Sequence, residues 1–370
     1  MFNDVLRVDS EYQNQAAQRM SQPTVPSQGH SSQDGPEPKG RIHAPVGKSL
    51  VRFYFANWFL VWLAIILATG MALPWVFKPV LTEAIQTRGQ QGVVFFVMFM
   101  MSLALPTDAL FRAFRQPGPT LLAVGLNWLV TPLLALITTP LLHGEFRGGV
   151  LLAAAMPCSM ASASVWTRRA GGNDAISLMV TVITNGTCFV VTPLLVLLLT
   201  GRQVQNFNVW EKVTELSLLV LMPLILAQLA RRMDTIRAFC DRHRSWLGVL
   251  TQTGLLFVIL LGAVKTGDRL HQATANSPTA FQILLMITTV LSIHTLVLFI
   301  GVVLSTIFKI AKPDGIAVGI AGSQKTLMIG LPMASELQTS ILPLVTFHAG
   351  QLLIDAVFAE RQQNQLEKSR

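Results

Sequence analysis

The sequence predicts an all-α integral membrane protein with ten transmembrane helices, and its composition and the length of its apolar runs carry this expectation. Apolar residues make up 51% of the 370-residue chain and charged residues only 13%, whereas soluble domains carry about a quarter charged residues. Most of the apolar runs are close to the roughly 20 residues that a helix needs to cross hydrocarbon. A third observation bears on function, because two of the runs are interrupted at their centres by small polar residues.

The first part of the chain differs in kind from the rest. Residues 1–52 are rich in Gln, Ser, Pro and Gly, and they contain no apolar run that could offset the entropy of ordering. We expect a disordered cytoplasmic N-terminal tail with no cleaved signal peptide, and a regulatory or docking role for it is the alternative. A ten-helix transporter domain over 53–360 and a cytoplasmic C-terminal tail over 361–370 complete the expected organisation.

Apolar windows place the ten spans in order along the chain. The second and tenth are short and the fifth and eighth are long, which tilting and packing accommodate. The fourth and ninth are the spans with polar centres. The expected spans are 57–74, 91–107, 119–141, 148–167, 174–200, 211–230, 246–265, 280–308, 315–335 and 340–358.

The charges in the loops orient these spans. Cytoplasmic loops of membrane proteins carry an excess of Lys and Arg, and with the N-terminus inside the inner segments hold most of them, including the Arg-rich loop 231–244. Without either broken span, this loop or the C-terminal arm would lie on the wrong side. We therefore expect a multipass protein of the cell membrane with both termini in the cytoplasm. Orientation explains the net charge of +9, so no nucleic-acid partner is needed.

The two interrupted spans point to a transporter. Unwound backbone survives at membrane depth only where it is buried in protein or lines a polar cavity. Transporters built from inverted repeats place substrate and ion sites at such breaks, and the two breaks occupy matching places in the two halves of the apolar region. The interrupting segments are Met156-Pro157-Cys158-Ser159-Met160-Ala161-Ser162-Ala163-Ser164 and Ala321-Gly322-Ser323-Gln324-Lys325-Thr326.

Several motifs around the breaks resemble the bile acid:sodium symporter family, and most closely its cotransporter 7-like branch. The resemblance covers nearly all of 50–360, and it implies two inverted five-helix repeats. These would form a panel domain (spans 1, 2, 6 and 7) and a core domain (spans 3–5 and 8–10), with the fourth and ninth helices crossing at their breaks. The motifs are Met156-Pro157, Gly171-Gly172-Asn173-Asp174-Ala175-Ile176-Ser177, Thr181, Thr192-Pro193, Gln324-Lys325-Thr326-Leu327, Gly330-Leu331-Pro332-Met333 and Phe347-His348-Ala349-Gly350-Gln351.

The same resemblance implies two sodium sites, matched here in part. At the first site Ser177 and Thr181 match the family pattern. The family's Ser-Asn pair falls on Ala163-Ser164, but the segment after Pro157 is one residue longer here, so Ser162 could take that role. The family's Glu falls on Ile320, so its carboxylate is missing. At the second site Asn127, five residues before a proline, and Gln324 match in chemistry. The side chains expected to hold sodium are Ser164, Ser177, Thr181 and Gln324.

Hard oxygen ligands suit Na⁺, but Ser and Thr also pack between membrane helices and bond neighbouring carbonyls. Both interpretations of these hydroxyls therefore stay open.

Lys325 is an ionisable residue at membrane depth, which is costly and usually functional. It has no obvious carboxylate partner in the sequence, since Glu336 is expected at the outer surface and Asp355 toward the inner end of the last span. One interpretation is that its ammonium occupies an ion site or repels cations from it. The alternative is a side chain that snorkels into the cytoplasmic vestibule.

His294 and His348 fall near the middles of the eighth and tenth spans, where a neutral imidazole bonded between helices and a proton-coupled role are both possible. No nucleophile elbow or HExxH pattern is present, so we expect no enzyme.

The predicted function is a secondary transporter of a small organic anion. Half-helix N-termini at the crossing would favour the anion, membrane lipid would surround the protein, and sodium coupling is in doubt. The alternative is a membrane regulatory protein of ion homeostasis without sodium-coupled transport. The candidate ion and substrate residues are Asn127, Ser162, Ser164, Ser177, Thr181, Gln324, Lys325 and His348.

Overall fold

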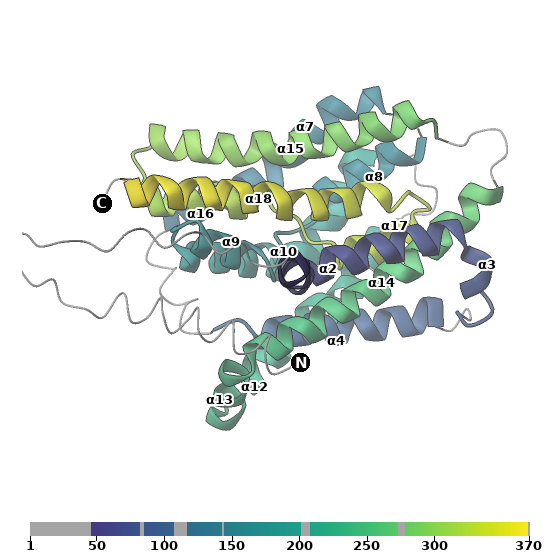
Figure 1. The fold of residues 1–370 in the computed structure, drawn as a ribbon, viewed down its shortest axis with the longest axis horizontal. Helices are drawn as coiled ribbons and strands as arrows, with labels where there is room; N and C mark the ends of the chain where they lie inside the picture. The colour runs from purple at the N-terminus through teal and green to yellow at the C-terminus, as the bar shows by residue number, and fades with distance from the viewer. Residues whose placement is uncertain are drawn as a thin grey trace, which may run out of the picture. The chain divides into compact units, whose positions relative to one another are not determined.

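The computed structural model describes residues 46–81, 85–106, 117–142, 144–200, 208–272 and 278–368. Throughout these ranges the regular structure is helical, as the sequence predicts (Figure 1). Most of the predicted N-terminal tail lies outside them. Helix α2 (Val46–Ala72) begins inside the region predicted as tail, and α18 (Leu342–Lys368) continues through most of the predicted C-terminal tail.

The other helices follow in chain order. Several spans consist of consecutive α-helical and π-helical stretches that continue one into the next. They are α3 (Pro74–Phe77), η1 (Ile85–Gly89), α4 (Gln90–Leu103), α6 (Pro117–Gly125), η2 (Leu126–Val130), α7 (Thr131–Thr138), η3 (Thr139–Leu141), α8 (Gly144–Ala154), α9 (Ala163–Arg169), α10 (Asp174–Thr200), α11 (Val209–Leu216), η5 (Ser217–Leu221), α12 (Met222–Ala230), α13 (Asp234–Arg242), α14 (Arg244–Gln272), α15 (Ala280–Ile307), α16 (Lys312–Ser323) and α17 (Gly330–Glu336).

Within the described residues, six helical stretches are long and apolar enough to cross a membrane. Two shorter apolar helices, Trp58–Ala72 and Gln90–Leu103, accompany them. The chain is therefore an integral multipass membrane protein. The six stretches are Pro117–Leu141, Asp174–Thr200, Val209–Ala230, Arg244–Asp268, Ala280–Ile307 and Leu342–Gln365.

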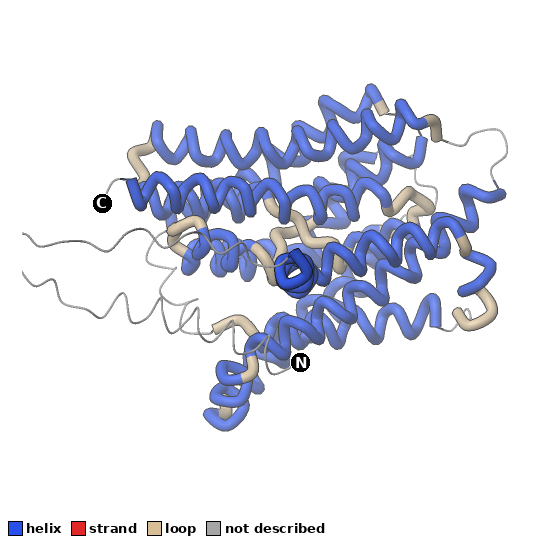
Figure 2. Tube along the Cα trace, in the orientation of Figure 1, coloured by secondary structure: helices blue, strands red, loops and turns tan. Residues whose placement is uncertain are grey.

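The two spans with polar centres are both broken. Helix α8 ends at Ala154 and α9 begins at Ala163, while α16 ends at Ser323 and α17 begins at Gly330. Figure 2 shows these breaks as loop segments running between the surrounding helices. The first break contains Pro157, which cannot donate a backbone hydrogen bond, followed by small residues that favour irregular backbone.

Contacts divide the chain into two units, residues 1–62 and 63–370, and the site lies in the second. There α4 packs against α12 and α14, while α15 packs against α16 and α18. Helices α15 and α16 pack closely at two glycines, where a Cβ on Gly301 would come within 2.8 Å of the Gly319 Cα. This close approach holds the second break against the eighth predicted span.

Candidate functional site at the helix breaks

The two breaks meet inside the protein. The backbone N–H of Thr326 in the second break donates to the carbonyl of Pro157 in the first, at 2.8 Å. This bond joins segments that lie in different halves of the chain. Each break leaves backbone groups without helical hydrogen-bond partners, and hydrocarbon offers none. The bond between the two breaks supplies such a partner.

Each break is also anchored by an amide side chain from the next membrane span along the chain. Asn185 on α10 donates through Nδ2 to the carbonyl of Cys158, at 2.9 Å. Gln351 on α18 accepts from the Lys325 N–H at 2.8 Å and donates to the Lys325 carbonyl at 2.9 Å. The same Gln351 amide nitrogen lies 3.0 Å from Nδ1 of His348, so His348 borders the second break.

Lys325 is only 2% exposed, and oxygen atoms surround its ammonium. Its Nζ lies 2.6 Å from the Asn127 carbonyl, 3.2 Å from the Asn127 Oδ1 and 2.9 Å from the Met156 carbonyl. The Trp128 ring centroid lies 5.5 Å away, within range of a cation–π contact. Three acceptors match the three N–H donors of an ammonium. The snorkelling interpretation is therefore wrong, because the side chain ends inside the protein.

A π-helical turn frees the Asn127 carbonyl for this contact. In η2 the Thr131 N–H donates to the Leu126 carbonyl, five residues back. The same pattern would pair the Asn127 carbonyl with residue 132, which is a proline and has no N–H. The Asn127 oxygen can therefore accept from Lys325. Such π-helical turns often mark functional sites.

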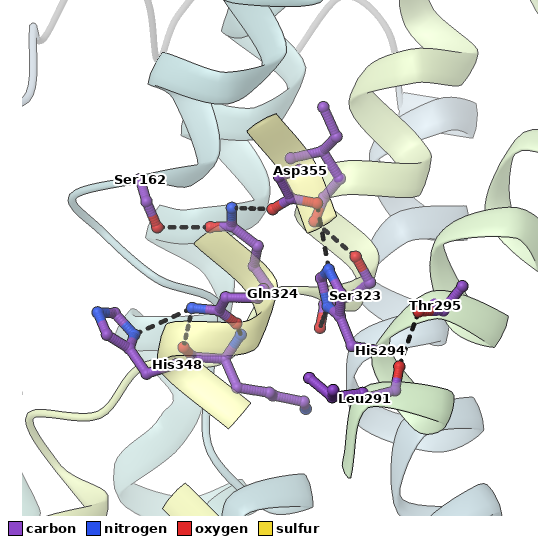
Figure 3. Close-up of polar contacts among 11 residues, drawn as sticks. Ser162, Leu291, His294, Thr295, Ser323, Gln324, His348 and Asp355 are labelled. Atoms are coloured by element: carbon purple, nitrogen blue, oxygen red, sulfur yellow. Dashed lines mark hydrogen bonds and ion pairs between the residues drawn. The ribbon is translucent and has the colours of Figure 1, made fainter. Parts of the chain in front are cut away.

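Gln324 links the first break to the last helix (Figure 3). Its Oε1 accepts from the Ser162 hydroxyl at 2.7 Å, and its Nε2 donates to the Asp355 Oδ2 at 2.6 Å. The Ser162 and Ser159 hydroxyls also bond each other at 2.8 Å, and Asn127 Nδ2 donates to the Gln324 carbonyl at 2.9 Å. Four of the predicted site residues, those at 127, 162, 324 and 325, thus belong to one network.

The carboxylate of Asp355 is fully buried and pairs with His294, as Figure 3 shows. His294 Nε2 lies 3.1 Å from Asp355 Oδ1, and its Nδ1 lies 3.2 Å from the Ser323 carbonyl. A carbonyl oxygen can only accept, so Nδ1 carries a hydrogen. The Nε2···Oδ1 contact then needs a second hydrogen, held by the imidazole or by the carboxyl group. The imidazole and the carboxyl group therefore share this second hydrogen, and the pair is electrically neutral.

The other predicted sodium ligands lie in a separate cluster. Ser177 and Thr167 hydroxyls bond each other at 2.6 Å, and the Thr181 hydroxyl donates to the Ser177 carbonyl at 2.8 Å. Ser164 is buried in the first turn of α9. These contacts favour the packing interpretation of Ser177 and Thr181, since one bond joins α9 to α10 and the other lies within α10.

Ile320, at the position of the family's Glu, lies in an apolar cluster that includes Leu298 and Phe358. Among the described residues, no group of three His, Cys, Asp or Glu side chains is placed to hold a metal ion.

Sequence reasoning missed the pairing of Asp355 with His294 and Gln324. It placed Asp355 toward the inner end of its span and connected it with no partner. A carboxylate inside an apolar helix is itself a signal for a functional site, but nothing in the sequence indicates which side chains would meet it. The fold brings together residues 61 positions apart.

Comparisons with known proteins agree with the motifs. The model of the SBF-like CPA transporter family matches residues 57–364. An uncharacterized protein of Pseudomonas aeruginosa is 26% identical over 314 residues, covering 80% of this chain and 93% of the relative. Sodium/bile acid cotransporter 7 of Danio rerio is 26% identical over 237 residues, covering 62% and 68%. Sodium/bile acid cotransporter 7-A of Xenopus laevis is 24% identical over 321 residues, covering 81% and 90%.

Proposed function

The chain belongs to the SBF-like CPA transporter family and is a membrane transporter of the bile acid:sodium symporter type, and from this premise we propose that it moves a small organic anion by alternating access. We further propose that the Lys325 ammonium takes the place of one coupling cation. The observation that carries this proposal is the set of oxygen atoms around Lys325 Nζ at the crossing of the two breaks.

Oxygen atoms of this kind are what a sodium ion requires. Two backbone carbonyls and one amide oxygen are hard ligands suited to Na⁺, and helix breaks are where transporters place such ions. Here the Lys325 ammonium already donates a hydrogen bond to all three oxygens. Sodium would have to displace it or share the site with a positive charge, so transport independent of sodium at this site is the expected behaviour.

The anchoring of the two breaks supports the proposed inverted repeats. Asn185 follows Cys158 by 27 residues, and Gln351 follows Lys325 by 26. In both halves an amide on the fifth span of the repeat bonds the backbone of the broken fourth span. Equivalent roles at nearly equal spacing are what two copies of one structural unit would produce.

Ion pairs join the proposed panel and core at one end of the molecule. Lys212 on α11 pairs with Glu336 on α17 and, at 2.6 Å, with Glu215. Helix α11 would belong to the panel and α17 to the core. The pairing therefore supports a state closed at this end, which a rocking motion would have to open.

The preference for an anion rests on the net positive charge of the network and on the names of the relatives. Helices α9 and α17 contribute little to this argument, because each is only seven residues long and carries a small dipole. Lys325 supplies a full positive charge at the crossing instead. An anion bound beside it would complete the charge balance.

A second candidate function is a membrane regulator of ion homeostasis without sodium-coupled transport. The apolar surroundings of Ile320 and the buried ammonium of Lys325 favour it, because both remove features that sodium coupling would need.

Proteoliposomes test both functions. We expect uptake of a labelled bile acid into liposomes that contain the purified protein, above that of empty liposomes and unchanged when sodium is replaced by potassium. Uptake that requires sodium would contradict the role of Lys325. The absence of flux under sodium, proton and voltage gradients, from protein that is shown to be folded, would favour the regulator.

A further inference from the structure

Helix α13 is tied closely to the ends of two membrane spans. Three residues separate it from α12, and His243 alone separates it from α14. Both neighbours lie in stretches apolar and long enough to cross a membrane. Figure 1 shows α13 leaving the ends of α12 and α14 sideways, across the direction of the spanning helices. Connections this short keep α13 at the level of the membrane surface.

One face of α13 packs on the protein, and exposed apolar side chains lie next to this face and at the N-cap of the helix. Cys240 is buried together with Leu103 and Leu247. Phe239 is 59% exposed and Met233 is 60% exposed. Large apolar side chains at the border between a packed face and an open one are typical of helices that lie in the interfacial region of a bilayer.

The arginines around α13 fall into two kinds. Arg231 is buried, where it donates to the Leu103 carbonyl at 2.6 Å and pairs with Asp241 at 2.8 Å. This arginine has a structural role, and it neutralises Asp241. Arg232, Arg242 and Arg244 are exposed. The surface around the helix therefore presents positive charge beside exposed apolar side chains.

We propose that this surface, formed by α13 with Arg232, Arg242 and Arg244, binds the anionic phospholipid headgroups of the membrane leaflet that it faces. The arginines contact lipid phosphates, while Phe239 and Met233 enter the boundary between headgroups and acyl chains. Charge complementarity and position both point to this partner. Anionic lipids concentrate in the cytoplasmic leaflet, and the excess of Lys and Arg in the same loop assigns it to that side.

Lipid-dependent thermal stabilisation of the full-length protein in detergent tests this proposal. The probes are phosphatidylglycerol, phosphatidylcholine and soluble glycerol phosphate. We expect phosphatidylglycerol to raise the melting temperature, because a ligand that binds the folded state stabilises it, and phosphatidylcholine and glycerol phosphate to have little effect. Native mass spectrometry would count the phosphatidylglycerol molecules retained.

A pair of matched double variants locates the effect. Arg232→Gln/Arg242→Gln removes two exposed charges at α13, and Arg88→Gln/Arg147→Gln removes two exposed charges elsewhere. Each arginine near an anionic surface contributes roughly fivefold in affinity, so the first variant should bind phosphatidylglycerol roughly 25-fold more weakly. The second should bind like the wild type. Equal melting temperatures without lipid would show that both variants fold.

Three results would overturn the proposal. Equal stabilisation by phosphatidylcholine would show that the surface does not select charge. Full stabilisation by glycerol phosphate would indicate a site for a soluble phosphate rather than a lipid surface. Loss of phosphatidylglycerol binding in the control variant instead of the α13 variant would show that the lipid binds elsewhere. The exposed surface of α13 would then be a candidate site for a protein partner.

Discussion

Lys325 resembles a metal ion in the way the protein holds it. Its ammonium has backbone and amide oxygens from two spans as partners, and these are groups that desolvation would otherwise leave unpaired. The charge is part of the polypeptide, so the site cannot be emptied by dilution. A protein built this way carries its cation through every conformational state.

Removal of this charge should create a sodium site. In Lys325→Gln the three oxygens lose their ammonium, and the repulsion that opposes Na⁺ disappears. At about 4 Å and an effective dielectric of about 20 that repulsion is about 4 kcal/mol, or roughly a thousandfold in affinity. We expect weak or no sodium binding in the wild type and measurable binding in the variant, by calorimetry or thermal shift. Tight sodium binding that is the same in both proteins would contradict the assignment.

Asp355 should tolerate an amide but not an aliphatic side chain. An asparagine can donate to His294 Nε2, which then needs no hydrogen, and accept from Gln324. In Asp355→Asn we therefore expect a melting temperature close to that of the wild type. Asp355→Leu leaves at least two buried polar groups without a partner, at about 1–3 kcal/mol each. Equal destabilisation in both variants would contradict the hydrogen-bond pattern.

Among the helices, α15 and α16 make a contact that leaves no room for a side chain at Gly301. A methyl group on Gly301 would meet the Gly319 Cα and the Leu126 side chain, so Gly301→Ala should cost about 1–3 kcal/mol through overpacking. Gly186→Ala on α10 is the matched control, because nothing lies within 4 Å of its Cβ position. Thermal unfolding should show a lowered midpoint for the first variant alone. A control that melts as low as Gly301→Ala would indicate a general effect of the substitution.

For the whole molecule, the distribution of Lys and Arg predicts the orientation in the membrane. Cysteines placed at Gln203 or Ser277, both outside the described residues, should react with an impermeant thiol reagent in intact cells. A cysteine at Arg237 on α13 should react only after permeabilisation. The native Cys158, Cys188 and Cys240 are buried and should give a low background. Inverse labelling would contradict the ten-span orientation.

The sequence predicts the helical class, the broken spans and the family because each of them depends on a local pattern of residues. Apolar length indicates a span, small polar residues around Pro157 and Gln324 indicate a break, and ordered motifs indicate relatives. No such pattern indicates the backbone partners of Lys325, because every residue has a backbone carbonyl and residue type does not mark the ones that accept.

The π-helical turn η2 could be predicted from the sequence only in part. The sequence singles out Asn127, five residues before Pro132, for its likeness to the family's Gln, yet its important feature is the backbone carbonyl that the proline leaves without a donor. The snorkelling alternative for Lys325, which the burial of the side chain contradicts, has the same origin. Long-range pairing decides where a flexible side chain ends, and a single sequence does not specify that pairing.

The bonds between the two breaks also constrain how the protein is made. The Met156 carbonyl accepts from a lysine synthesised 169 residues later, and the neighbouring Pro157 carbonyl accepts from the residue after that lysine. At about 5–20 residues per second, a ribosome needs roughly 10–30 s to supply them. During that interval the unwound segment of the first half enters the bilayer while its Met156 and Pro157 carbonyls still lack their hydrogen-bond donors. Insertion machinery or water must shelter it until the second half arrives, so release of the nascent chain before that point should yield a product that cellular quality control degrades.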